Sequence, residues 1–334
     1  MKESALQYFV CPSCQSSLFV SDASHIDGNQ IKEGTLTCNS RKHRFQITGF
    51  VARFVSTEGS TSSFGFEWIK HPRTQLDSAT GMRLSEDRFF RQTNWPRDLS
   101  GRQILEVGCG AGRFTEIALK TGGQVFSIDA SRAVDANWSN NGDHPNLTLC
   151  QANLFALPFL KNSFDNVFCF GVLQHTPNVA AAFAALSGFV RRGGSLAVDV
   201  YNKDHWLNYH TPIYLLRPIT RHIASDRLYR LISSTMPALM RLSSWLRRAP
   251  RIGRKLSALI PIANYDGLLP TDSKELIEQH SVLDTFDTLS PRYISPQRPA
   301  TVGGWFRSAG YEEIESNNET VFFMRGVRMS GGES

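Results

Sequence analysis

The sequence has no long hydrophobic run. None of its apolar stretches approaches the roughly 18 residues that a membrane-spanning helix needs, so we expect no such helix. The first residues, MKESALQYFVCPSC, lack the apolar core of a signal peptide, so we expect a cytoplasmic protein. Thiols stay reduced in the cytosol. We therefore expect no disulfide among the six cysteines, which are Cys11, Cys14, Cys38, Cys109, Cys150 and Cys169.

The glycine-rich stretch ILEVGCGAGRF, residues 104–114, lacks what two common nucleotide-binding loops require. A P-loop ends in Lys followed by Ser or Thr, and no such pair follows Gly108. A dinucleotide-binding loop has a third glycine where this chain carries Arg113, whose side chain would obstruct close packing of helix on strand. Glu106 precedes the glycines, and a carboxylate there repels phosphate. The pattern favours a ligand that carries an ammonium or sulfonium charge. The alternative is a tight turn without a ligand.

Residues 65–202 alternate between strand-like and helix-like patterns, which is typical of a parallel sheet with helices on both faces. The predicted strands are 103–108, 124–129, 147–150, 164–170 and 195–201, and the predicted helices are 112–120, 131–140 and 178–191. The C-terminal part predicts a helix over 298–309. Two strands, 311–316 and 320–325, follow it and are joined by an Asn-rich turn, so we expect them to pair antiparallel.

Polar residues follow the second and third predicted strands. Asp129 ends the second strand, and its carboxylate can accept hydrogen bonds from two ribose hydroxyls. NAD and S-adenosylmethionine both contain such a ribose, so Asp129 alone does not distinguish between them. Asn153 follows the third strand and precedes LPFLKNSFDNVFCFGVLQHTPN, residues 157–178.

Four ordered motifs together resemble the class I S-adenosylmethionine-dependent methyltransferases. They are LEVGCGAGRFTEIA, SIDAS, LPFLKNSFDNVFCFGVLQHTPN and FVRRGGSLAVDVY, and they cover roughly residues 100–202. The resemblance implies an α/β fold with a seven-stranded, Rossmann-like sheet whose last strand is antiparallel. It also implies that Glu106, Gly108 and Gly110 surround the methionine part of the cofactor and that Asp129 holds the ribose. Asn153 would face the adenine amino group where the family usually carries Asp, and Leu154 would pack on the ring.

The N-terminal cysteines suggest a metal site. A thioredoxin-like CPSC pair should open a helix, whereas the residues after Cys14 look like a strand. Cys11, Cys14, Cys38 and His43 form a ligand set that suits structural Zn²⁺, and metal binding can stabilise a segment too short to bury a large core. The arrangement resembles the zinc-binding N-terminus of rRNA guanine-N1 methyltransferases. The alternative is a knuckle that has lost its metal. The remaining three cysteines are expected to be small buried hydrophobes.

A basic helical insert follows the fifth predicted strand. Residues 205–260 carry ten Lys or Arg and one acid, Asp226. Apolar residues recur at roughly helical spacing, and Pro237 should kink or divide the helix. Three interpretations stay open: a solvated lid face, a contact for an anionic substrate or a membrane surface, and a nucleic-acid patch. The chain lacks the N/D-P-P-F/Y motif and the Pro-Cys pair of some base methyltransferases, which argues against RNA. The apolar positions are Leu228, Leu231, Ile232, Leu239, Leu242 and Leu246.

These observations predict three parts: a zinc-ribbon-like segment at 1–54, a linker and lid helices at 55–100, and a methyltransferase domain at 101–334 with a helical insert at 203–270. His175 and Tyr201 follow strands four and five and are the candidate catalytic residues. The aromatic stretches 64–71 and 283–296 are expected to line the acceptor pocket.

The expected function is methyl transfer from S-adenosylmethionine to a small molecule or a glycan or lipid-linked acceptor, with O-methylation favoured. The aromatic stretches and the insert also resemble, more weakly, bacterial methyltransferases of cell-surface glycan and natural-product pathways. The alternatives are an rRNA or tRNA base methyltransferase and a non-catalytic cofactor-binding protein. A basic insert would permit peripheral contact with the inner face of the membrane.

Overall fold

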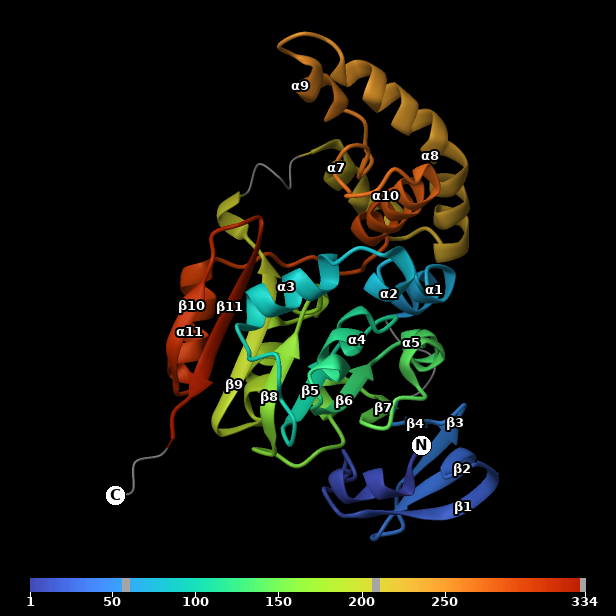
Figure 1. The fold of residues 1–334 in the computed structure, drawn as a ribbon, viewed down its shortest axis with the longest axis vertical. Helices are drawn as coiled ribbons and strands as arrows, with labels where there is room; N and C mark the ends of the chain where they lie inside the picture. The colour runs from blue at the N-terminus through green and yellow to red at the C-terminus, as the bar shows by residue number, and fades with distance from the viewer. Residues whose placement is uncertain (56–60, 206–210, 331–334) are drawn as a thin grey trace.

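The computed structural model describes residues 1–55, 61–205 and 211–330. Parts of two predicted segments, 56–60 of the linker and 206–210 of the insert, lie outside these residues. One mixed sheet runs through the molecule, with its strands in the order β1-β2-β3-β4-β7-β6-β5-β8-β9-β11-β10. A small N-terminal segment forms one edge of this sheet, and a layer of helices lies beyond the carboxyl ends of the central strands (Figure 1).

The central sheet confirms the predicted methyltransferase fold. Strands β7, β6, β5, β8 and β9 pair in parallel, and β11 pairs antiparallel with β9 and β10. The bounds are β5 Gln103–Val107, β6 Gln124–Asp129, β7 Leu147–Gln151, β8 Phe164–Cys169, β9 Val190–Tyr201, β10 Tyr311–Ser316 and β11 Val321–Arg328.

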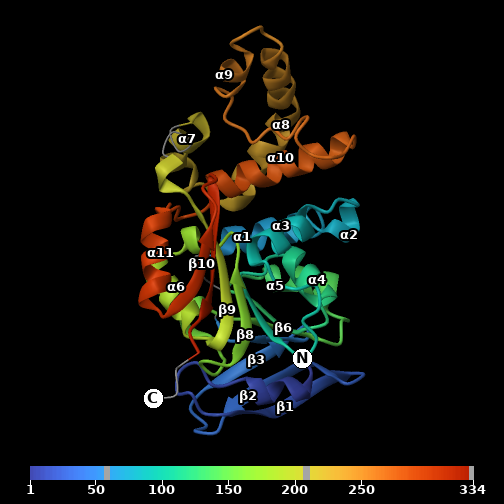
Figure 2. The ribbon, with the colours of Figure 1, turned by 60° about the vertical axis from the view of Figure 1, so that its left-hand side comes forward.

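Helices cover both faces of this sheet, as the strand–helix alternation predicted. Figure 2 shows α6 and α11 on one face and α3, α4 and α5 on the other. Their apolar side chains form two separate buried clusters, one on each side of the strands. The bounds are α3 Leu84–Thr93, α4 Arg113–Lys120, α5 Ala133–Asn141, α6 Val179–Ser187 and α11 Pro299–Ser308.

One predicted helix is too long. The helix expected over 178–191 ends at Ser187, and residues from Val190 onward belong to β9. The backbone pairing explains the difference. Val190 already pairs with Phe164 of β8, and the regular pairing of the two strands begins at Ser195, after a register shift. The basic and glycine residues of this stretch therefore form the irregular start of a strand.

The N-terminal segment continues the same sheet. Strand β4 pairs in parallel with β7, and the hairpin strands β1, β2 and β3 extend the sheet antiparallel from there. Phe9 stacks on Phe159 with ring centroids 5.4 Å apart, so the apolar core is continuous across the junction. The segment therefore packs directly on the methyltransferase sheet. The bounds are β1 Leu18–Asp27, β2 Gln30–Cys38, β3 Arg44–Thr48 and β4 Val51–Arg53, with a 3-10 helix η1 at Glu3–Tyr8.

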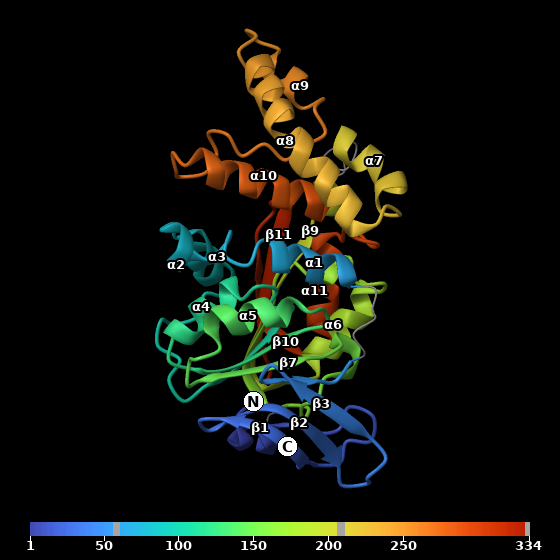
Figure 3. The same ribbon diagram turned by 90° about the vertical axis from the view of Figure 1, so that its right-hand side faces the viewer.

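The helical layer contains α7, α8 and α9 of the insert, together with α1 and α10, which both contact α8 (Figure 3). Leu228, Ile232 and Met236 of α8 pack against Val282 and Phe286 of α10 in a third apolar cluster. The bounds are α1 Ser62–Lys70, α2 Asp77–Thr80, α7 Pro212–Thr220, α8 Ser225–Arg247, α9 Gly253–Ser257 and α10 Lys274–Leu289.

Pro237 lies inside α8, so of the two predicted effects, a kink or a division of the helix, the division does not occur. The apolar positions predicted for this helix do not form one buried face. Leu228 and Ile232 are buried against α10, whereas Leu231 and Leu242 are 57% and 43% exposed. Helix α8 therefore has an apolar inner face and a second set of apolar side chains directed toward solvent.

Candidate active site

The glycine loop between β5 and α4 approaches the neighbouring strand end very closely. Gly108 has φ +82°, and a Cβ at this position would lie 2.1 Å from Cγ2 of Val172. Only glycine combines this backbone conformation with such close contact. The amides of Gly108 and Cys109 both donate to the carbonyl of Ile128, at 2.7 and 2.9 Å, which ties the loop to β6.

Glu106 lies behind the loop and does not line the cavity in front of it. Its Oε2 accepts hydrogen bonds from Thr115 Oγ1 at 2.5 Å and Ser127 Oγ at 2.6 Å. Its Oε1 has no partner among the described residues. Burial raises the pKa of Glu106 to about 7, and the two hydroxyl donors oppose this shift.

Asp129 lines the cavity from the carboxyl end of β6. Its carboxylate accepts hydrogen bonds from the amide of Gly110 at 3.1 Å, the amide of Ser131 at 2.8 Å and the hydroxyl of Ser131 at 2.7 Å. Burial raises its pKa despite these donors. Asp129 therefore joins the glycine loop to the second strand at the point where a ligand in the cavity would meet both.

Asn153 and Leu154 complete this side of the cavity. Asn153 begins the 3-10 helix η2, Leu154–Ala156, and its Oδ1 accepts from the amide of Phe155 at 3.0 Å. Five of the six predicted cofactor positions thus border one space, and Glu106 supports the loop from behind. The five are Gly108, Gly110, Asp129, Asn153 and Leu154.

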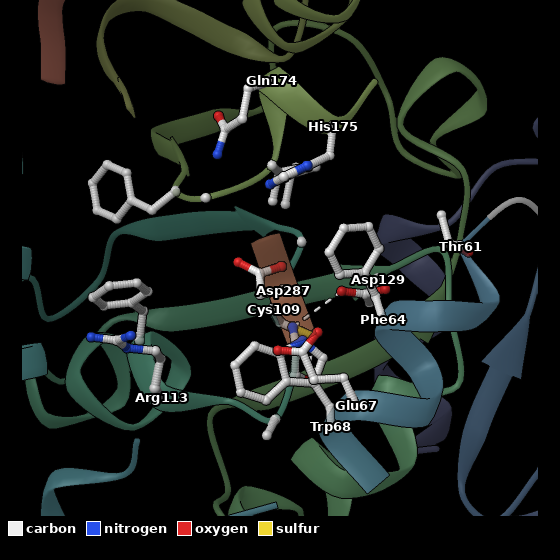
Figure 4. A pocket seen from close by; sticks show the side chains of 18 of the residues that line it. Thr61, Phe64, Glu67, Trp68, Cys109, Arg113, Asp129, Gln174, His175 and Asp287 are labelled. Carbon is white, nitrogen blue, oxygen red and sulfur yellow. Dashed lines mark hydrogen bonds between the residues drawn. The ribbon is translucent and has the colours of Figure 1, made fainter. Parts of the chain in front are cut away.

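The cavity has a volume of about 830 Å³ and extends from the glycine loop to the helical layer. Both aromatic stretches that were expected at the acceptor side contribute to its wall: 64–71 through Phe64 and Trp68, and 283–296 through Leu283 and Tyr293. Figure 4 shows Trp68 and Glu67 on one side of the space, with His175 and Gln174 across from them.

His175 and Tyr201 both line the cavity. His175 lies in the 3-10 helix η3, Leu173–His175, and its Nδ1 is 3.1 Å from the carbonyl oxygen of Tyr293. A carbonyl only accepts, so Nδ1 carries the proton and Nε2 is left as an acceptor. Burial lowers the pKa of His175 to about 4 and raises that of Tyr201, so both side chains are neutral near pH 7.

Sequence reasoning missed a group of carboxyl residues in the cavity. Glu67 of α1 and Asp284 and Asp287 of α10 all line it. Burial raises the pKa of each aspartate to about 6, and that of Glu67 well above its usual range. The sequence signal was two acids three residues apart in LDTFDTL, a spacing that places both on one helix face.

The predicted metal ligands lie together in the N-terminal segment. One ligand atom from each of Cys11, Cys14, Cys38 and His43 lies within 4.8 Å of all the others. His43 Nδ1 is 3.4 Å from Cys11 Sγ and 3.6 Å from Cys38 Sγ. Tetrahedral Zn–S and Zn–N bonds imply a separation of about 3.5 Å, so the cluster has the dimensions of a zinc site. None of the four residues lines the cavity. All six cysteines are free, as expected.

The sheet order, the antiparallel last strand and the glycine loop followed by Asp129 define the class I methyltransferase fold. Comparison with protein families agrees, because residues 105–198 match the family described as "Methyltransferase domain". The chain therefore contains a class I S-adenosylmethionine-dependent methyltransferase domain.

Two curated proteins are similar to about a third of this chain. A ubiquinone biosynthesis O-methyltransferase from Methylococcus capsulatus is 30% identical over 129 residues, which cover 37% of this chain and 54% of that protein. A tRNA U34 carboxymethyltransferase from Idiomarina loihiensis is 32% identical over 114 residues, or 30% of this chain and 33% of that protein. The chain thus spans about half the length of the first relative and a third of the second.

Among solved structures, an O-methyltransferase family protein from Burkholderia thailandensis aligns with a TM-score of 0.42 and 14% identity. The alignment covers 75% of this chain and 57% of that one.

Replacing Glu106 should change how stability depends on pH. A carboxyl whose pKa is raised from 4.5 to about 7 on folding holds a proton that the unfolded chain releases, so it lowers the stability of the native state as pH rises through this window. Glu106→Gln keeps an acceptor for Thr115 and Ser127 and removes this effect. Relative to wild type, the variant should gain about 2–3 kcal/mol between pH 5 and pH 8 in urea unfolding.

The exposed residue Glu312 provides the control, because Glu312→Gln should leave the pH profile as in wild type. Identical pH profiles for wild type and Glu106→Gln would show that the buried carboxyl does not titrate in this range.

Proposed function

We propose that the protein transfers a methyl group from S-adenosylmethionine to a hydroxyl of a small molecule or glycan, including a lipid-linked one. The supporting observation is a single cavity that connects the glycine loop and Asp129 to an aromatic, carboxyl-containing compartment under the helical layer. A cofactor at one end and an acceptor at the other would share this space, as alignment of the two reactants requires.

The residues of the cavity fit the cofactor. In the proposal, Gly108 and Gly110 border the methionine part, with Glu106 behind them, and Asp129 accepts hydrogen bonds from the ribose hydroxyls. Asn153 faces the adenine amino group, and Leu154 packs on the ring. When bound, S-adenosylmethionine supplies a methyl group activated by its sulfonium.

The chain itself would orient the acceptor, exclude water and accept a proton. His175 is our candidate proton acceptor, because its Nε2 is free of the Tyr293 contact and its low pKa keeps the ring neutral. Tyr201 lies beside it, with ring centroids 5.7 Å apart, and would help to position the acceptor hydroxyl. A hydroxyl is a poor nucleophile, and proton acceptance assists its attack.

The cofactor assignment predicts a selective binding result. Calorimetry should detect S-adenosylmethionine or S-adenosylhomocysteine and no NADH. Asp129→Ala should weaken cofactor binding by about 1.5–3 kcal/mol, since it removes a charged hydrogen-bond partner. The exposed Asp143→Ala is the matched control and should bind as wild type does.

Binding of NADH in place of S-adenosylmethionine would refute the assignment. Methyl transfer itself is tested with cofactor labelled at the methyl group and fractionated cell extract. Cofactor binding without transfer to any fraction would favour the non-catalytic alternative.

We infer that the N-terminal cluster holds one structural zinc ion. Three thiolates and one imidazole, at the separations described above, suit tetrahedral Zn²⁺ with no open position for substrate. The site's position away from the cavity supports a role in stability. Folding of this segment would then depend on the metal.

Elemental analysis of protein purified without chelator should find about one equivalent of zinc. Cys14→Ser should lose most of it and unfold at a lower temperature, whereas Ser13→Ala, at an exposed neighbouring position, should retain it. A fully folded wild type that contains no zinc would contradict the proposal.

The basic insert is proposed to contact an anionic surface. Its exposed residues include the basic Arg241, Arg248 and Arg254 and the apolar Trp245, Ile252 and Leu259, which are 64%, 54% and 62% exposed. A segment that exposes both basic and apolar side chains suits the interface of an anionic membrane. Within the described residues, no helix combines the length and apolarity needed to cross a bilayer. RNA is the alternative partner, because one relative carries the name of a tRNA enzyme.

Vesicle sedimentation distinguishes the two partners. Replacing Arg248, Arg254 and Lys255 with Ala should weaken binding to phosphatidylglycerol vesicles roughly 100-fold, at about 1 kcal/mol for each charge. Arg247 is left intact, because it donates to the carbonyls of Asp266 and Asn264 and holds that loop. The control replaces the exposed Lys42, Arg73 and Arg307. Tight RNA binding that falls steeply with salt and is lost in the first variant would overturn the membrane proposal.

A further inference from the structure

Three buried polar atoms of the cavity have no hydrogen-bond partner among the described residues. They are Glu67 Oε2, Gln174 Oε1 and His280 Nε2. Glu67 and Gln174 are each only 1% exposed. An unpaired buried polar atom is costly, so its presence in a cavity wall indicates a ligand group that pairs with it.

The carboxyl group of Glu67 stands close to the two aspartates. Burial is the main cause of the raised pKa of Glu67, and the negative charges of Asp287 and Asp284 raise this pKa further. Figure 4 shows the side chains of Gln174, Asp287 and Glu67 converging on the same space. Tyr265 donates its hydroxyl to Asp284, so this aspartate is already fixed in position. The acceptor end of the cavity is therefore rich in groups that accept hydrogen bonds.

We propose that Glu67, Gln174 and Asp287 bind a polyhydroxylated ring, so that the methyl acceptor is a sugar or a cyclic polyol. This inference rests on the proposed function, and it names the substrate class. Several hydroxyls spaced around one ring can donate to acceptors on α1, on α10 and after β8 at the same time. The aromatic side chains of Phe64, Tyr201 and Tyr293 provide apolar contact for the carbon skeleton of the ring.

The cations of the cavity argue against an amine acceptor. The guanidinium groups of Arg113 and Arg88 line the same space and are close enough to Asp284 to lower its pKa against the effect of burial. A ring hydroxyl can donate to the carboxyl oxygens and also accept from these guanidinium groups, whereas an ammonium group can only donate. A simple phenol has one hydroxyl and would leave most of the acceptor atoms unpaired.

The test uses the 334-residue chain saturated with S-adenosylhomocysteine and three sets of probes. They are neutral methyl glycosides of common hexoses and deoxyhexoses, cyclic amines, and simple phenols. Ligand-observed NMR should detect a subset of the glycosides at millimolar concentration and neither of the other sets. Glu67→Gln and Asp287→Ala should each weaken glycoside binding about tenfold, since each removes a carboxyl oxygen that would pair with a ring hydroxyl.

Glu275 is an exposed residue of α10, the helix that carries Asp287. The matched control is Glu275→Gln, which should bind glycosides as wild type does. Affinity for S-adenosylhomocysteine should stay within about twofold in all three variants, because none of these residues is assigned to the cofactor. This measurement also shows that each variant is folded.

The outcomes separate the two proposals. A wild type that does not bind S-adenosylhomocysteine refutes the proposed function and the inference with it. If S-adenosylhomocysteine binds but amines or phenols also bind, the polyol inference alone is overturned. The same holds if S-adenosylhomocysteine binds and no glycoside does. Unchanged glycoside affinity in both folded variants would also overturn it.

Discussion

The chemistry of the cavity depends on the apolar packing of the helices above it. Phe286 and Val282 of α10 meet Leu228 and Ile232 of α8 in one cluster, and Phe66 of α1 packs against it. This contact fixes α1 and α10 over the carboxyl ends of the strands, where their acidic side chains are removed from water. Burial then raises the pKa values of Glu67, Asp284 and Asp287. Loosening this packing would expose both the acidic side chains and the cavity to solvent.

The opposite end of the cavity is shaped by backbone rather than by side-chain packing. Gly108 allows the loop to lie against Val172, and Asp129 accepts from the amide of Gly110. Glu106 reaches Thr115 of α4 and Ser127 of β6 from behind, so it links the helix and the strand that enclose the loop. In the proposed function, the loop end of the cavity would hold the cofactor and the helical end the acceptor, as alignment of the two reactants requires.

The N-terminal segment is joined to the catalytic sheet along its edge. Strand β4 pairs with β7, and Arg53 forms an ion pair with Asp135 of α5 at 2.5 Å. The edge of the methyltransferase sheet is thereby covered, and an exposed edge strand is an aggregation hazard. A metal cluster that stabilises this segment would stabilise the sheet edge as well.

The sequence by itself determined the parallel core and the cysteine–histidine set, because periodicity, glycine spacing and ligand spacing are local, and the resemblance to class I methyltransferases implied the antiparallel last strand. It placed His175, Tyr201 and both aromatic stretches at strand ends or beside the core motifs, and these line the cavity. Only the tertiary structure decided that Pro237 lies within one helix, that residues 190–194 begin a strand, and that Glu67 meets Asp284 and Asp287. These features depend on contacts between distant segments, where packing outweighs local preference. The acids were invisible as a group because α1 and α10 are far apart in sequence and are brought together only by the fold.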